Sequence, residues 1–175
     1  MAALARACRE VDFPARIQVV VSPREAVPAV ETARSLGLSI AVAPPGEDYG
    51  SRLVEALEGC RWVCLAGFMQ LLPSEVLAAF PNRVLNIHPA LLPKFGGKGM
   101  FGTHIHKAVI EAGESESGCS IHLVNERYDE GPLLLQMKCA VEPGDTPETL
   151  ATRVLELEHV AFPLALKEAI LAERK

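Results

Sequence analysis

Short β-branched apolar runs alternate with amphipathic segments along the first 115 residues, and this alternation restricts the fold more than any other feature of the sequence. Apolar runs of strand length predict strands over residues 17–21, 38–42, 61–66 and 83–87. Helical spacing predicts helices over residues 24–36, 51–58, 74–80 and 103–112, the last with Thr103 as its N-cap. Helices that connect strands act as crossovers, which make the strands parallel and cover both faces of the sheet. We therefore expect an α/β fold with an open, mainly parallel, Rossmann-like sheet.

The two ends of the chain depart from this alternation. The chain begins on a helical pattern without a capping residue, and one face of that pattern carries Ala3, Leu4, Ala7, Cys8 and Val11. Beyond residue 115, runs over 120–124 and 133–141 are joined only by a turn at 128–132, which predicts an antiparallel strand pair. Thr146-Pro147 then predicts the start of a long helix, which Pro163 should kink.

Length, charge and cysteine content limit the class of protein. The 175 residues form one expected domain, 1–175, without a linker or an internal repeat. A formal net charge of −5 argues against a nucleic-acid partner, and no apolar stretch reaches the ~18 residues that cross a bilayer. The five cysteines are an odd number within apolar stretches, which is typical of reduced thiols in a cytoplasmic protein.

The densest polar signal lies at the end of the fourth expected strand. The period of two places Asn86 and His88 on the same face, and Pro89 ends strand pairing directly after them. Ligands of open α/β sheets bind beyond the carboxyl ends of the strands, where both side chains would lie. A carboxamide and an imidazole can stabilise an oxyanion and move a proton. The alternative is that both side chains only satisfy the backbone of the following loop.

Other polar residues allow a structural interpretation as readily as a functional one. Asp129 lies in the turn at 128–132, where an aspartate usually caps its own backbone, and His122 could be a half-buried strand histidine. Residues 97–102 match G-x-G-x-x-G, but a loop separates them from the preceding strand, so a dinucleotide site is disfavoured. A mobile loop that folds over a ligand fits this segment better, with Lys98 as a candidate anion contact.

Metal-ligand spacing is not found in the sequence. His104 and His106 would point to opposite sides of a helix, and Cys60 and Cys64 lack the spacing of a zinc ribbon. We therefore expect no metal cofactor.

Four motifs in order resemble the folate-dependent formyltransferase family along almost the whole chain. They are Ala66-Gly67-Phe68-Met69-Gln70-Leu71-Leu72, Leu85-Asn86-Ile87-His88-Pro89-Ala90-Leu91-Leu92-Pro93, Gly118-Cys119-Ser120-Ile121-His122 and Asp129-Glu130-Gly131-Pro132. Lys94, Gly96-Gly97, Thr103-His104 and Glu158-His159 make the match closest to members that formylate glycinamide ribonucleotide in purine synthesis.

The resemblance implies a reaction and a set of site residues. The amine of glycinamide ribonucleotide would attack the formyl carbon of 10-formyltetrahydrofolate, the co-substrate. Asn86 would bind the oxyanion, His88 would act as the acid or stabilise charge, and Asp129 would hold His88 and relay the proton. The folate would contact Phe68, Met69, Gln70, Leu71, Leu72, Val124, Asn125 and Glu126, with Met69 and Leu72 packed on its pterin. The nucleotide would contact Pro89, Lys94, His122 and Glu158. The family usually has Arg where Gln70 stands, which weakens any inference about the glutamate tail of the folate.

The beginning of the chain differs from the family pattern. Family members begin with an apolar strand and a Gly-Ser-rich turn that binds the phosphate of the nucleotide, whereas this sequence begins within the next helix. We expect a chain truncated relative to the family. Two strands would then face a gap with unpaired edges, the phosphate site would be impaired, and the protein would be destabilised or prone to form oligomers such as a homodimer.

Other functions remain open at this point. A formyltetrahydrofolate hydrolase would use the same three residues on water but normally carries an additional N-terminal domain, and a methionyl-tRNA formyltransferase would need a basic C-terminal domain. A non-catalytic protein that binds folate or nucleotide is a further alternative. A dinucleotide-dependent oxidoreductase is the most distant one.

Overall fold

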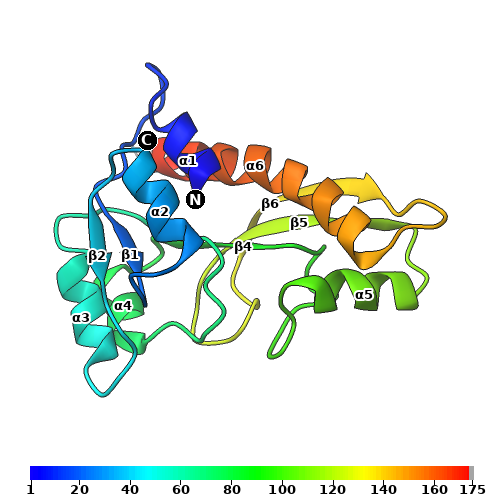
Figure 1. Cartoon of the computed structure of the whole chain (residues 1–175), viewed down its shortest axis with the longest axis horizontal. Helices are drawn as coiled ribbons and strands as arrows, with labels where there is room; N and C mark the ends of the chain where they lie inside the picture. The colour runs from blue at the N-terminus through cyan, green and yellow to red at the C-terminus, as the bar shows by residue number, and fades with distance from the viewer. Residues whose placement is uncertain (174–175) are drawn as a thin grey trace.

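A computed structural model describes residues 1–173 and shows a mixed α/β protein (Figure 1). Its elements follow in the order α1 (Ala2–Ala7), β1 (Val20–Ser22), α2 (Pro28–Ser35), β2 (Ile40–Val42), α3 (Tyr49–Ala56), β3 (Val63–Leu65), α4 (Ser74–Ala79), β4 (Val84–His88), α5 (Thr103–Glu111), β5 (Glu116–Leu123), β6 (Leu133–Ala140) and α6 (Pro147–Ala172). The expected alternation of strands and helices is thus confirmed.

Several boundaries differ from those expected, for local reasons. The first two strands are shorter than their apolar runs because β1 and β2 pair only from Val20↔Ile40 to Ser22↔Val42. Helix α1 ends at Ala7, so Val11 shares no face with it and is 99 % exposed. Gly102, not Thr103, is the N-cap of α5, with a φ of 57° that L-residues rarely adopt.

The strands form two sheets rather than one within the described residues. β1 pairs with β2 in parallel, and a second sheet has the order β3-β4-β5-β6. Parallel pairing is confirmed for β3 with β4, whereas antiparallel pairing begins at β4 with β5 and continues to β6. Among residues 1–173, β1, β2, β3 and β6 therefore each have one edge without a strand partner.

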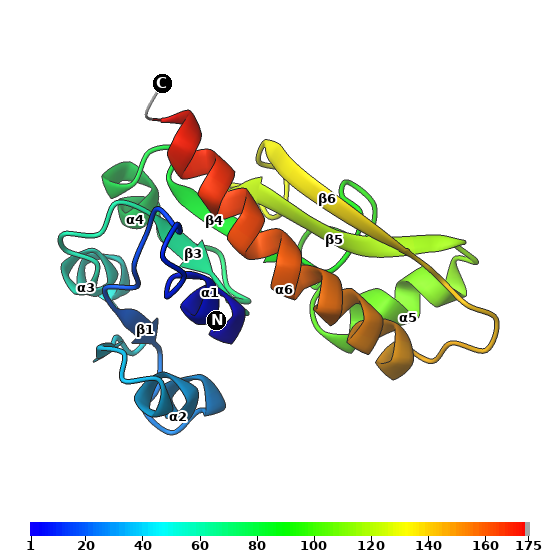
Figure 2. The same cartoon turned by 90° about the horizontal axis from the view of Figure 1, so that it is seen from above.

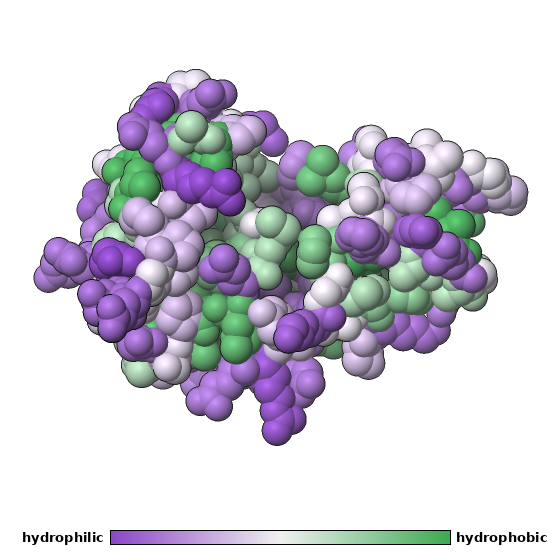
Figure 3. All heavy atoms as spheres, turned by 60° about the horizontal axis from the view of Figure 1, so that its bottom comes forward, coloured by the Kyte–Doolittle hydropathy of each residue, from purple (hydrophilic) through white to green (hydrophobic). Residues whose placement is uncertain are grey.

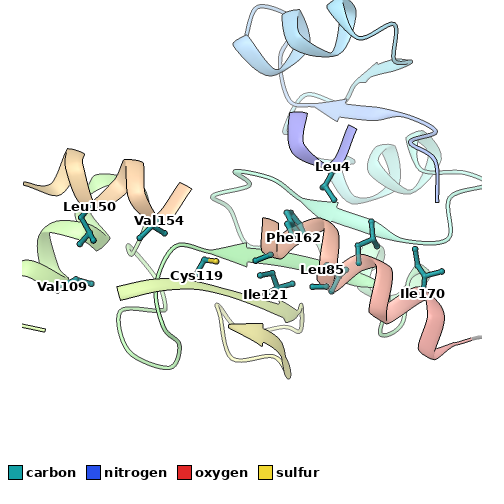
Figure 4. Close-up of a cluster of buried hydrophobic side chains, with 12 residues drawn as sticks. Leu4, Leu85, Val109, Cys119, Ile121, Leu150, Val154, Phe162 and Ile170 are labelled. Atoms are coloured by element: carbon teal, nitrogen blue, oxygen red, sulfur yellow. The ribbon is translucent and has the colours of Figure 1, made fainter. Parts of the chain in front are cut away.

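The main core lies between α6 and one face of the four-stranded sheet. Figure 2 shows α6 crossing over the sheet, and Figure 4 shows the buried side chains that join it to α1, α5, β4 and β5. Thr146 caps α6 by accepting a hydrogen bond from the Thr149 N–H, and Pro163 lies within the helix. A second cluster joins β1, α3, β3 and α4 and includes Val21, Leu53, Val63 and Val76. Apolar burial thus connects the two sheets where hydrogen bonds do not.

Strand parity places the polar residues of β4 away from α6. Leu85 and Ile87 pack in the main core, so Asn86 and His88 face the other side of the sheet. The register places His122 opposite Asn86, and Ser120 opposite His88. Within residues 1–173, no helix combines the length and apolarity that a bilayer crossing needs.

Candidate active site

Four polar side chains from β4, β5 and the turn after β5 converge on the sheet face opposite α6. Asn86 Nδ2 lies 3.1 Å from His122 Nε2 and 3.5 Å from Asp129 Oδ1. His88 Nδ1 lies 3.5 Å from Asp129 Oδ2. The expected group of Asn86, His88 and Asp129 is therefore brought together, and His122 joins it. Asp129, which could have been only a turn cap on the evidence of the sequence, thus belongs to this cluster.

Hydrogen-bond partners determine which nitrogen of each imidazole carries a proton. His122 Nδ1 lies 2.9 Å from the Leu123 carbonyl, which can only accept, so Nδ1 carries the proton. His122 Nε2 lies 3.1 Å from Asn86 Nδ2 and 3.5 Å from Asp129 Oδ1, so it accepts from the Asn86 amide when it carries no proton and donates to Asp129 when it carries one. His88 Nε2 lies 2.8 Å from the Phe95 carbonyl and therefore donates to it. The Nδ1 of a neutral His88 is thus the basic atom, and it faces Asp129.

The backbone around Asp129 is shaped to hold its carboxylate. Asp129 has a φ of 55°, a left-handed conformation that aspartate tolerates in turns. Its Oδ2 accepts from the Gly97 N–H at 2.9 Å. The glycine-rich loop thus contacts the cluster through one backbone N–H. Residues 97–102, which match G-x-G-x-x-G, therefore contact Asp129 through Gly97.

Burial and neighbouring charges shift the pKa values of the cluster in identifiable directions. Burial lowers the pKa of His88, although Asp129 and the Phe95 carbonyl partly oppose this effect. Burial raises the pKa of Asp129, but the contacts with His122, the Gly97 N–H and His88 outweigh it, so the net pKa lies below the usual range. At neutral pH the site therefore holds a neutral imidazole beside a carboxylate. This pair can take up a proton and stabilise the cation that results.

We expect the protein to lose stability as the pH falls below about 6.5, the ordinary pKa of histidine. Burial lowers the pKa of both His88 and His106, and the buried His106 Nδ1 has no hydrogen-bond partner among residues 1–173. The unfolded chain therefore takes up protons at a higher pH than the folded chain does, which favours unfolding in acid. Thermal melting at about pH 7.5 and about pH 5.5 measures this effect. His106→Asn should show a smaller decrease, and an equal or higher melting temperature at the lower pH would contradict the assignment.

Two of the four expected nucleotide contacts lie elsewhere or are already engaged. The Lys94 ammonium forms an ion pair with Glu114 at 2.8 Å. Glu158 lies on α6, across the sheet from the cluster, where burial raises the pKa of its carboxyl and the N-terminal ammonium lowers it. Pro89 immediately follows His88 and therefore lies beside the cluster, and its contact with the nucleotide stays a prediction. The structure thus brings His122 and Pro89 to the site but not Lys94 or Glu158.

Three of the expected folate-binding residues, Val124, Asn125 and Glu126, line a hollow, and Val124 lies beside the start of β4, where its N–H donates to the Val84 carbonyl. A cavity of about 510 Å³ is lined by Leu77, Val124, Asn125, Glu126, Arg127 and Glu130. Met69 and Leu71 are 66 % and 47 % exposed, whereas Leu72 is buried in the second core cluster. Leu72 thus packs against the core, and its contact with the pterin stays a prediction. Figure 3 shows that hydrophobic residues are exposed among hydrophilic ones on this face of the molecule.

Sequence reasoning missed several groups that complete the site. They are the Phe95 carbonyl, the Gly97 N–H and the side chains of Ser120 and Gln136. Backbone groups leave no signal in residue identity. Ser120 does alternate with His122 along one strand face, a signal that could have identified it. No group of three or more His, Cys, Asp and Glu side chains is arranged to hold a metal among residues 1–173.

Comparisons with known proteins agree on one family. A family model described as formyl transferase matches residues 1–166. A chloroplastic phosphoribosylglycinamide formyltransferase of Arabidopsis thaliana is 43 % identical over 175 residues, which cover 95 % of this chain and 60 % of that protein. Phosphoribosylglycinamide formyltransferase of Escherichia coli K12 is 33 % identical, with 94 % and 78 % covered. The chain thus spans about three fifths of the length of the Arabidopsis relative.

Solved structures show the same fold. Glycinamide ribonucleotide transformylase 1 of Symbiobacterium toebii superimposes with a TM-score of 0.87 at 38 % identity, covering 94 % of this chain and 79 % of that one. A formyltetrahydrofolate deformylase of Pseudomonas syringae has a TM-score of 0.81 at 22 % identity, covering 95 % and 55 %, a likeness of fold alone.

Proposed function

This chain belongs to the formyl transferase family, and we propose that it transfers the formyl group of 10-formyltetrahydrofolate to the amine of glycinamide ribonucleotide. The observation that carries the proposal is the convergence of Asn86, His88 and Asp129 at the carboxyl end of β4. Relatives with formyltransferase names at 33 % to 43 % identity support the same substrates.

Each member of the cluster suits one step of this reaction. The amine nitrogen attacks the formyl carbon, and the carbonyl becomes an oxyanion. One Asn86 amide proton is engaged by His122 at 3.1 Å, whereas the contact to Asp129 is long at 3.5 Å. The second proton is therefore available to turn toward the oxyanion, which a neutral donor stabilises in a water-poor site.

His88 and Asp129 then handle the proton that the amine loses. Asp129, with its side chain 12 % exposed, is more accessible than His88 at 5 %. In our proposal Asp129 accepts the amine proton and passes it toward the tetrahydrofolate nitrogen as the carbon–nitrogen bond of the donor breaks. While the intermediate exists, Asp129 shares this proton with the neutral His88 Nδ1, and the cationic imidazole that results stabilises the oxyanion. We place the pterin at the hollow lined by Val124, Asn125 and Glu126.

We expect tetrahydrofolate release from 10-formyltetrahydrofolate to require glycinamide ribonucleotide. The measurement compares release by the purified chain with and without the nucleotide, and formylated product is quantified in parallel. Equal release without the nucleotide would indicate a hydrolase instead. Release under neither condition would contradict the proposed function for this chain.

Two further properties stay predictions from the sequence. They are a cytoplasmic location and a homodimer. The named relatives include chloroplastic proteins from two plants.

A further inference from the structure

A fully buried serine holds the turn that follows His88. The Ser120 Oγ donates to the Ala90 carbonyl at 2.6 Å and accepts from the Leu92 N–H at 3.0 Å. It also accepts from Gln136 Nε2 at 2.8 Å. A hydroxyl offers one donor and two acceptor sites, so every hydrogen-bonding capacity of this side chain is used.

Gln136 on β6 completes the attachment of this turn. Its Nε2 also donates to the Leu92 carbonyl at 3.0 Å. Because a carbonyl only accepts, this contact fixes the orientation of the amide group. Both backbone groups of Leu92 and the carbonyl of Ala90 are thus held by two side chains. Removing either side chain leaves backbone groups without partners at a site that water reaches poorly.

The segment that follows residues 90–92 contacts His88. After Leu92 the chain continues to Phe95, whose carbonyl accepts the His88 Nε2 proton at 2.8 Å. Ser120 is also the register partner of His88 across β4 and β5, on the same sheet face. A displacement of segment 90–92 would therefore move the carbonyl that fixes the His88 proton.

We propose that Ser120 and Gln136 are positioning residues: by fixing segment 90–92 they hold the Phe95 carbonyl against His88 Nε2 and thereby direct His88 Nδ1 toward Asp129. The expected effect on rate rests on the proposed function. The effect on the His88 ring does not, because it is a property of the free protein.

Other groups that act on His88 are unchanged by substitutions at these two positions. Asp129 faces its Nδ1 from the turn after β5, His122 lies nearby on β5, and His106 lies on α5. The Phe95 carbonyl raises the pKa of His88. Its displacement should therefore lower that pKa further and allow the proton of the neutral ring to occupy either nitrogen.

The ring can be observed directly by nitrogen NMR of labelled protein through a pH titration. We expect the neutral His88 of the parent to carry its proton on Nε2. In Ser120→Ala and Gln136→Leu, part of the population should carry it on Nδ1, and the titration midpoint should move to lower pH. Lys138→Gln is the matched control, because Lys138 lies further along β6 in an exposed ion pair with Glu116. This control should titrate as the parent does.

The kinetic readout separates positioning from a loss of fold. We expect kcat of formyl transfer to fall roughly 10²-fold in both variants while KM changes little, because a misplaced ring affects the chemical step. An unchanged Nε2 proton and an unchanged midpoint in the folded variants would overturn the inference. If Ser120→Ala does not fold, Gln136→Leu decides. If no variant and no parent transfers formyl, the proposed function fails, and the NMR result still decides the positioning role.

Discussion

The Asp129→Asn variant should lose formyl transfer by about 10²–10⁴-fold in kcat, the usual contribution of an acid–base group. Asparagine has nearly the same shape, and its carbonyl can still accept from the Gly97 N–H that now binds Asp129 at 2.9 Å. It carries no charge, however, so it can neither take the amine proton nor stabilise a protonated His88. The measurement is steady-state kinetics at saturating concentrations of both substrates.

The control for this substitution is another carboxylate on the same hairpin. Glu116 lies at the start of β5, 2.9 Å from Lys138 and exposed. Glu116→Gln removes the same charge far from the cluster and should keep the parent kcat. A kcat of Asp129→Asn within a few-fold of the parent, in a protein that still folds, would remove Asp129 from the proposed mechanism.

Gly131→Ala should destabilise the protein by roughly 3 kcal/mol or more, the upper range for overpacked sites. A Cβ at Gly131 would overlap the Leu123 carbonyl oxygen and lie 3.5 Å from His122 Nδ1. The first atom belongs to the backbone, so only a shift of β5 can relieve the overlap. That carbonyl also accepts from His122 Nδ1, so the shift would reach the site.

Urea denaturation of the parent and the variant measures this loss. Gly46→Ala is a suitable control, because the nearest atom to its Cβ would be the flexible end of the Arg52 side chain at 3.1 Å. The control should change the free energy of unfolding by less than about 1 kcal/mol, as surface substitutions usually do. If the Gly131→Ala variant were as stable as the Gly46→Ala control, the close approach of residue 131 to β5 would be wrong.

The alternation of side chains along a strand was enough to place Asn86 and His88 together, because it depends on that strand alone. Asn86 and His88 share a sheet face whatever surrounds the strand, so their neighbourhood followed from a period of two. Asp129 could not be assigned in this way, since its role depends on a turn that folds back over β4. The resemblance to a known family supplied that residue, and the distances now give the physical reason.

The remaining differences concern partners that no residue pattern encodes. Lys94 was expected at the nucleotide, but Glu114 binds its ammonium. The proton positions on both imidazoles depend on the carbonyls of Phe95 and Leu123, which any residue type would supply. Ser120 and Gln136 lie together because they are register partners in β5 and β6, and the sequence alone does not give that register.

The division of the strands into two sheets has a consequence for how the molecule opens. No strand hydrogen bond joins β1 to β3 among the described residues, so the link between the sheets is apolar contact without directional bonds. Such an arrangement lets the β1–β2 unit loosen as a separate cooperative unit with its own opening free energy. Asn86, His88, His122 and Asp129 all belong to the other unit. The Asn86, His88, His122 and Asp129 cluster is therefore expected to stay assembled when β1, α2 and β2 loosen from the rest of the molecule.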